Sequence, residues 1–210
     1  METADVVVIG AGVIGSATTL ELARRGRRVI CVDAGPGVGA GSTSSSASII
    51  RFHYSTMDAV LTSWEAAAMW DHWADHLGVV DPDGMVKFVQ TGCLVFDFPG
   101  SNRDTVLSML GQIGIDYEEL TAEQIKRRWP TLDIGDYWPP RPIDDPTFAD
   151  DAHGELGGYY TPQAGFIDDP MRSAGNLMYA ARHHGAVLRL NTKVVAIRQA
   201  GGNVQGVTLA

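Results

Sequence analysis

The stretch from residue 5 to residue 33, DVVVIGAGVIGSATTLELARRGRRVICVD, decides the fold. Its β-branched run Asp5–Ile9 is short and stops at a glycine, which predicts a buried strand. The apolar spacing over Ile14–Arg25 predicts a helix that Gly26 ends, and the run Arg28–Val32 predicts a second buried strand. A strand, a helix and a strand in so short a stretch predict a βαβ unit with parallel strands.

The turn between the first strand and the helix carries Gly10, Gly12 and Gly15 in the order G-x-G-x-x-G. In this arrangement the first glycine allows a tight turn, the second lets a pyrophosphate approach the backbone, and the third lets helix and strand pack closely. The helix N-terminus adds free N–H donors and a partial positive charge. Asp33 closes the second strand, where its carboxylate can accept hydrogen bonds from two ribose hydroxyls and would repel the 2′-phosphate of NADP. The stretch therefore predicts a bound dinucleotide, and it does not distinguish NAD from FAD.

Length, composition and charge are those of an ordinary soluble globular protein. The chain has 210 residues, 45% of them hydrophobic and 20% charged, which allows one large or two small domains. A net charge of −9 argues against nucleic acid or an anionic membrane as a partner. The sequence has no signal peptide pattern and no transmembrane segment, so we expect a cytoplasmic protein. Two cysteines make neither a disulfide framework nor a zinc site, and His72 and His76 lack a third ligand, so we expect no metal.

Beyond the βαβ unit the sequence predicts further helices, strands and one long loop. A single helix is expected over Ser55–Leu77, two strands or one bent strand in KFVQTGCLVFDF, and a surface loop over 133–158. Asp169 and Pro170 predict the start of a helix that Gly185 ends. The other predicted elements are helices at Arg103–Ile113 and Ala122–Arg128 and strands at Val187–Leu190, Lys193–Arg198 and Val204–Leu209, the last two joined by a turn at Gly201-Gly202.

The segment after Asp33, GPGVGAGSTSSSASIIR, is rich in glycine and serine. Composition alone would make it a solvated flexible linker. Together with VVVIGAGVIG and a later stretch, GGYYTPQAGFIDDPMRSAGNLMYAARHHGAVLRLNTKV, it resembles the N-terminal portion of the FAD-dependent amine and D-amino-acid oxidoreductases. That family includes glycine oxidase, sarcosine oxidase and dimethylglycine dehydrogenase-like enzymes. The resemblance is close over 5–77 and 157–209 and loose over 78–156, and it implies an ordered loop.

The resemblance implies the role of each candidate site residue. Ser42 and Thr43 would hold the pyrophosphate, and Arg51 would bind the substrate carboxylate, although an ion pair with an acid is an alternative for this arginine. His53 is a weaker catalytic candidate, because packing near the site would also explain it. Ser45 stands where some relatives carry a flavin-linked histidine, so the FAD is expected to be non-covalent. The implied cofactor-binding residues are Gly10, Gly12, Val13, Ile14, Gly15, Asp33, Ala34, Gly41, Ser42, Thr43, Ser46, Ala47, Ile49 and Val194.

The resemblance also implies a domain organisation and a reaction. An α/β, Rossmann-type (glutathione reductase-like) FAD-binding domain would comprise 1–84 and 157–210, with part of an inserted α+β substrate domain at 85–156. The implied reaction oxidises the C–N bond of a neutral amine in an amino acid or N-methyl amino acid by hydride transfer to flavin, and water hydrolyses the resulting imine. The alternatives are an NAD-dependent dehydrogenase or a non-catalytic FAD-binding subunit. Because family members are roughly twice as long, as expected of a two-domain flavoenzyme, a second chain could supply their C-terminal half.

Overall fold

The computed structural model describes residues 2–210 and divides into two compact units. The first unit comprises the described residues up to Ser48, together with 69–89 and 166–210. The second unit comprises 49–68 and 90–165.

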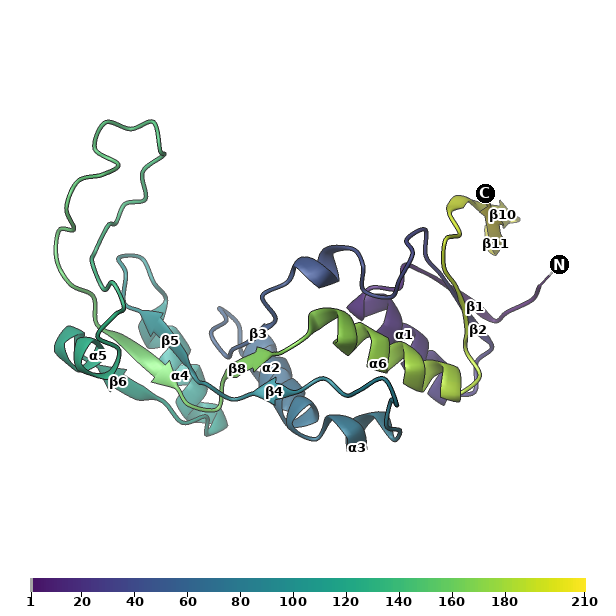
Figure 1. Cartoon of the computed structure of the whole chain (residues 1–210), viewed down its shortest axis with the longest axis horizontal. Helices are drawn as coiled ribbons and strands as arrows, with labels where there is room; N and C mark the ends of the chain where they lie inside the picture. Colours follow the sequence, from purple (N-terminus) through teal and green to yellow (C-terminus); the bar gives the residue numbers. More distant parts are fainter. Residues whose placement is uncertain (1) are drawn as a thin grey trace. The chain divides into compact units, whose positions relative to one another are not determined.

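A parallel sheet forms the centre of the first unit. Strand β1 (Val6–Ile9) pairs in parallel with β2 (Val29–Val32), which pairs in parallel with β9 (Val187–Arg189). Helix α1 (Val13–Arg24) connects β1 to β2 and lies beside α6 (Pro170–His183), as Figure 1 shows. The βαβ unit and the Rossmann-type α/β class are thus confirmed.

The predicted ends of these helices are also confirmed. Gly26 follows α1 in the left-handed conformation with φ 72°. The Asp169 side chain accepts a hydrogen bond from the backbone N–H of Arg172 and caps α6, with Pro170 as the first helical residue. Gly185, with φ 88°, follows the end of α6. Each helix therefore ends where a residue with the required backbone or side-chain chemistry stands.

The last part of the first unit is a β-hairpin. Strands β10 (Val194–Ala200) and β11 (Asn203–Leu209) pair antiparallel around Gly201 and Gly202. Both glycines have positive φ, 58° and 78°, which is the backbone of a type I′ turn. The predicted hairpin is confirmed.

The single helix predicted over Ser55–Leu77 is wrong, because the structure has two helices there. Helix α2 (Met57–Asp71) ends before His72, whose φ of −113° and ψ of 45° are not helical, and α3 (Trp73–Leu77) follows. The break turns Trp73 into the core, where it is 7% exposed and its Nε1 donates to Asn176 on α6. Burial of a large aromatic ring here outweighs the continuous helical propensity.

The second unit is built around an antiparallel sheet in the order β5-β7-β6. Its core includes Phe52, Val60, Leu110 and Tyr159, each at most 1% exposed. The stretch KFVQTGCLVFDF was predicted to form two strands or one bent strand, and it forms two. The strand β6 was not predicted. The elements of this unit are β3 (Ile49–Ile50), most of α2, β5 (Cys93–Phe96), α4 (Arg103–Ile113), β6 (Glu118–Leu120), α5 (Ala122–Arg128) and β7 (Gly158–Thr161).

Two further strands are short. β4 (Phe88–Val89) pairs antiparallel with β8 (Gly165–Ile167). The compact units do not follow the predicted domain ranges 1–84, 85–156 and 157–210 along the chain. Because compactness does not assign a cofactor or substrate role, those ranges stay a prediction.

Candidate functional site

The glycine turn at the start of α1 has the geometry that its sequence predicts. Gly10 has a φ of 101°, which residues with a side chain rarely adopt. A Cβ atom on Gly15 would lie 1.8 Å from the carbonyl oxygen of Gly10. Gly12 is the N-cap of α1 and has no side chain to cover the helix N-terminus. The turn therefore brings α1 against β1 and places no side chain of Gly12 over the helix N-terminus.

Asp33 ties this turn to the end of β2. One carboxylate oxygen accepts a hydrogen bond of 2.6 Å from the N–H of Ala11, and the other accepts one of 2.6 Å from the N–H of Gly35. A carboxylate oxygen can accept two hydrogen bonds, so each still has a place for a hydroxyl donor. This arrangement fits a ribose with two adjacent hydroxyl groups.

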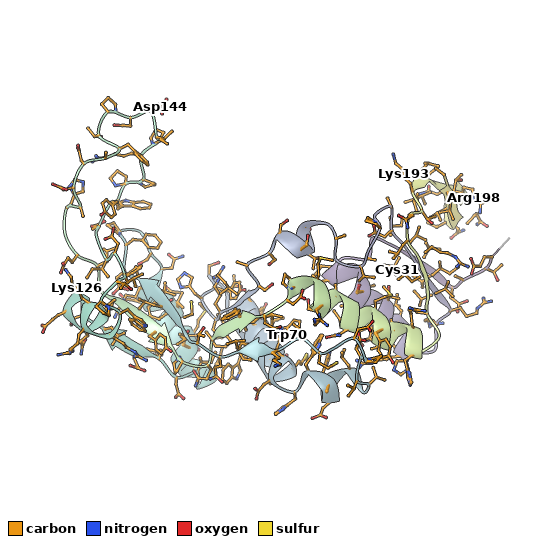
Figure 2. The ribbon with its side chains drawn as sticks, in the orientation of Figure 1. Cys31, Trp70, Lys126, Asp144, Lys193 and Arg198 are labelled. Atoms are coloured by element: carbon orange, nitrogen blue, oxygen red, sulfur yellow. The ribbon has the colours of Figure 1, made fainter. Side chains whose placement is uncertain are left out.

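A cavity of about 260 Å³ opens at the same place. It lies at the carboxyl ends of β1 and β2, where open α/β sheets bind their ligands. Val194, which lies far from Asp33 in sequence, begins β10 and lines this cavity. The full lining is Ile9, Gly10, Val32, Asp33, Ala34, Thr192, Lys193 and Val194, and Figure 2 labels Lys193.

The serine-rich loop is ordered and attached to the glycine turn. The N–H of Gly39 donates to the carbonyl oxygen of Ala11 at 2.8 Å. The buried Thr43 hydroxyl accepts a hydrogen bond of 3.0 Å from the N–H of Val13, the first residue of α1. Its own hydrogen remains available to a phosphate oxygen. The ordered loop implied by the resemblance is therefore present, with a short 3₁₀ helix, η1, at Ser42–Ser45.

The other predicted cofactor residues lie on the surface of this region. Gly41, Ser42, Ser46 and Ala47 are exposed on the loop, and so is Ala34 after β2. Ile14 is 78% exposed in the first turn of α1. Exposed apolar and small residues beside a helix N-terminus fit a large cofactor with a flat ring system and a pyrophosphate. Their contacts to FAD stay a prediction.

Arg51 lies on a separate cavity of about 570 Å³ in the second unit. Its half-buried guanidinium donates to the backbone carbonyl oxygen of His53 and lies 4.8 Å from the centre of the Tyr54 ring. Ile49 and Ile50 form an apolar part of the wall, and Asp58 contributes one carboxylate. The remaining lining comes from α2 and the residue before it: Thr56, Ala59, Thr62, Ser63 and Ala66.

Arg51 takes part in none of the ion pairs formed within residues 2–210. The alternative that an acid of this chain pairs with Arg51 is thus not supported. A guanidinium has five N–H donors, so the bond to the His53 carbonyl leaves others for a bound carboxylate. The arrangement can bind and orient a carboxylate from outside the chain.

His53 is held by the core rather than placed on the Arg51 cavity. Its Nδ1 is hydrogen-bonded to the Tyr159 hydroxyl, and the two rings stack. Burial and the nearby Arg51 charge lower the pKa of His53, and burial raises the pKa of Tyr159 far above its usual range. His53 does not line the cavity, and its backbone carbonyl oxygen accepts the hydrogen bond from Arg51, so its catalytic role stays a prediction.

The sequence analysis missed several residues around these two cavities. Asp58, Thr62 and Ser63 share the Arg51 cavity and recur at helical spacing on α2, a signal that could have found them. Lys193 lines the other cavity, and nothing in its local sequence distinguishes it. Within residues 2–210 no three potential ligands gather at a metal site. No helix in that range is long and apolar enough to cross a membrane, and the cytoplasmic location stays a prediction.

The fold and the glycine turn define a dinucleotide-binding protein of the Rossmann type. The sequence matches the family described as FAD dependent oxidoreductase over residues 5–210, and the chain belongs to this family. The resemblance stated from the sequence is thereby confirmed. FAD, rather than NAD, is the cofactor of the family, which resolves the choice that the glycine motif left open.

Known relatives are distant and longer. A protein of Arabidopsis thaliana named as a sarcosine oxidase is 24% identical over 214 residues, 97% of this chain and 44% of that protein. A bifunctional amine oxidase of Dictyostelium discoideum is 29% identical over 138 residues, 62% of this chain and 12% of that protein. The chain therefore spans less than half the length of these curated relatives.

Solved structures share the fold. L-proline dehydrogenase from P. horikoshii has a TM-score of 0.75 at 22% identity, covering 99% of this chain and 49% of that one. Glycine oxidase from Bacillus cereus has a TM-score of 0.69 at 22% identity, covering 99% and 52%. At this identity the likeness establishes the fold alone.

Proposed function

We propose that this chain forms the FAD-binding part of an enzyme that oxidises the C–N bond of an amino acid or N-methyl amino acid. The observation that carries the substrate class is the half-buried Arg51 guanidinium, which has no acidic partner in residues 2–210 and lines a cavity. A carboxylate is the ligand that complements this group. Family membership supports the redox chemistry.

The residues of the first unit would hold FAD. The backbone of the Gly10–Gly15 turn and the Thr43 hydroxyl would bind the pyrophosphate, and Asp33 would bind the adenosine ribose. Val194 would contact the nucleotide from the start of β10. When bound, FAD supplies the acceptor for a hydride from the carbon beside the substrate nitrogen. Water then hydrolyses the imine product.

The residues of the second unit would bind and orient the substrate. Arg51 would hold the carboxylate through two parallel hydrogen bonds, which fixes the direction of the Cα–N bond. The Tyr54 ring supports the guanidinium from one side, and the His53 carbonyl holds one of its nitrogen atoms. The Ile49 and Ile50 side chains line part of the wall and would exclude water from it when a substrate fills the cavity, which would strengthen the ion pair. The amine reacts in its neutral form, and no side-chain base is required.

Arg51→Gln tests the substrate assignment in the complete enzyme. We expect the KM for an amino-acid substrate to rise by about tenfold or more, because a charged hydrogen-bonded pair is lost. Arg51→Lys should recover only part of the loss, because an ammonium cannot form the bidentate pair. Arg25→Gln removes the same charge from an exposed position and should leave KM unchanged. An unchanged KM for Arg51→Gln, with faster oxidation of amines that lack a carboxylate, would contradict the proposal.

We also propose that the whole enzyme contains a further polypeptide portion, supplied by the same chain or by a second one. The chain spans about half the length of relatives, and the β10–β11 hairpin leaves Val195, Ile197 and Val204 54%, 55% and 66% exposed. Apolar side chains at this exposure are candidates for burial by another polypeptide. Gel filtration with and without a polypeptide corresponding to the remaining half of the relatives tests this. Separate elution of the two would count against a second chain as the source.

A further inference from the structure

The loop that follows Asp133 and leads to β7 encloses a second cavity of the second unit, with a volume of about 450 Å³. We call residues 133–157 the aromatic loop. Figure 1 shows it extending from the region of β5 and β6, and Figure 2 labels Asp144 at its far end and Lys126 near its base. Its lining residues differ entirely from those around Arg51. This cavity is therefore separate from the one that Arg51 lines.

Hydrogen bonds hold the aromatic loop in shape. At the base, Gly135 and Glu155 form an antiparallel bridge, and the N–H of Leu156 donates to the carbonyl oxygen of Ile134 at 2.7 Å. Lys126 on α5 forms an ion pair of 2.8 Å with Glu155. Further out, Arg141 donates to the carbonyl oxygen of Thr147 at 2.5 Å and connects the two limbs of the loop. The backbone of the loop and these two side chains thus hold the cavity in shape.

Aromatic rings form much of the cavity wall and remain accessible. Four aromatic residues contribute: Phe98, Tyr137, Trp138 and Phe148. Their exposed fractions are 38%, 54%, 43% and 51%, respectively. The ring centres of Phe98 and Trp138 lie 5.6 Å apart at an angle of 30° between their planes. Accessible aromatic faces carry negative electrostatic potential and attract cations.

The charged residues of the wall favour a cation as well. Asp136, Asp150 and Asp151 line the cavity, and Arg141 is the one arginine or lysine among the lining residues. Arg141 lies 3.4 Å from Asp150, whose carboxylate offsets its charge, and 3.3 Å from the His153 Nε2. Two carboxylates, Asp136 and Asp151, remain without a lysine or arginine partner within residues 2–210. The cavity is therefore net negative.

We propose that this cavity is a binding site for a small organic cation, of the class of alkylated ammonium compounds. An alkylated ammonium has an apolar surface that packs on the aromatic rings and a charge that the two carboxylates neutralise. A bare metal ion fits poorly, because aromatic rings are not ligands and no metal-binding group of side chains occurs in residues 2–210. An anion is disfavoured by the two unpaired carboxylates.

Ligand-detected NMR of the 210-residue protein with choline as the probe tests the proposal. The comparison ligand is neohexyl alcohol, the neutral molecule in which carbon replaces the nitrogen of choline. We expect choline to bind at least about fivefold more tightly, because only the cation gains from aromatic faces and carboxylates. Trp138→Leu and Asp136→Asn should each weaken choline binding by about fivefold or more. Asp144→Asn, at the exposed end of the loop and outside the cavity, is the matched charge control and should change it less than about twofold.

The outcomes separate the proposal from its alternatives. Equal binding of choline and the neutral alcohol would overturn it, as would tighter binding of acetate or no binding of choline at all. An equal effect of Asp144→Asn and Asp136→Asn would show that choline responds only to the overall negative charge of the loop, which would also overturn the proposal. If Trp138→Leu disturbs the loop, as judged by circular dichroism, Phe148→Leu on the other limb tests the same aromatic contact.

Discussion

At the scale of single residues, Gly15 lies so close to the backbone of Gly10 that a side chain would collide with it. We predict that Gly15→Ala destabilises the protein by about 3 kcal/mol or more, because a backbone atom 1.8 Å from the new Cβ cannot move aside cheaply. Urea unfolding measures the change. Gly175→Ala is the matched control, since its Cβ meets nothing within 4 Å inside α6, and it should stabilise by about 0.5–1 kcal/mol. Equal effects at the two positions would show that the close contact is absent.

The charge state of His53 gives a prediction about pH. Burial and Arg51 lower its pKa in the folded protein below the value of about 6.5 in the unfolded chain. Folding therefore favours the neutral ring. The stability that this contributes is present above the unfolded pKa and is lost as pH falls through that value toward the folded one.

Urea unfolding at about pH 7.5 and about pH 5.5 tests this dependence. We expect His53→Asn to lose less stability between the two pH values than the unchanged protein does. His72→Asn is the matched control, because the His72 side chain is 70% exposed and its replacement should leave the slope unchanged. Identical slopes for all three proteins would count against the burial of a neutral His53.

At the scale of elements, the cap of α6 fixes where that helix begins. The Asp169 carboxylate accepts a hydrogen bond of 2.9 Å from the N–H of Arg172. We predict that Asp169→Ala lowers the free energy of unfolding by about 1 kcal/mol, because an N–H at the helix N-terminus loses its acceptor. Asp169→Ser should retain most of the stability. A thermal unfolding series on the three proteins measures both, and equal losses for alanine and serine would contradict a capping role.

Elements with strong local signals could be predicted from the sequence, and elements set by tertiary packing could not. The glycines, the N-cap of α6 and the Gly201-Gly202 turn act through their own backbone or side chain, so the βαβ unit, α6 and the hairpin were predicted correctly. The break at His72 depends on the burial of Trp73, and β6 depends on its pairing with β7. Asn176, which contacts Trp73, and β7, which pairs with β6, both lie far away in the sequence.

The same distinction applies to the candidate site. Asp33 and Val194 could be assigned to one ligand from the motif and the resemblance, and the structure places both on one cavity. The place of Asp58 on the Arg51 cavity and the cavity of the aromatic loop were missed. Both depend on contacts between side chains that are separated in the sequence. A composition rich in proline and aspartate predicted a solvated loop, whereas its hydrogen bonds enclose a cavity.

At the scale of the whole molecule, a bound cofactor should stabilise the folded chain by mass action. All residues proposed for the nucleotide lie on this chain, so we predict that FAD at about 100 times its Kd raises the free energy of unfolding by about 2.7 kcal/mol. At the same FAD concentration, Asp33→Asn should gain less, because it binds FAD more weakly. Its amide has one acceptor oxygen, whereas the carboxylate has two that accept from the N–H groups of Ala11 and Gly35 and would accept from the ribose. Asp144→Asn removes the same charge far from these groups and should keep the full gain. Thermal unfolding with FAD, with NAD and without ligand measures all three proteins. A gain with NAD that equals or exceeds the gain with FAD would contradict the assignment of the glycine turn, Asp33 and Val194 to a flavin nucleotide.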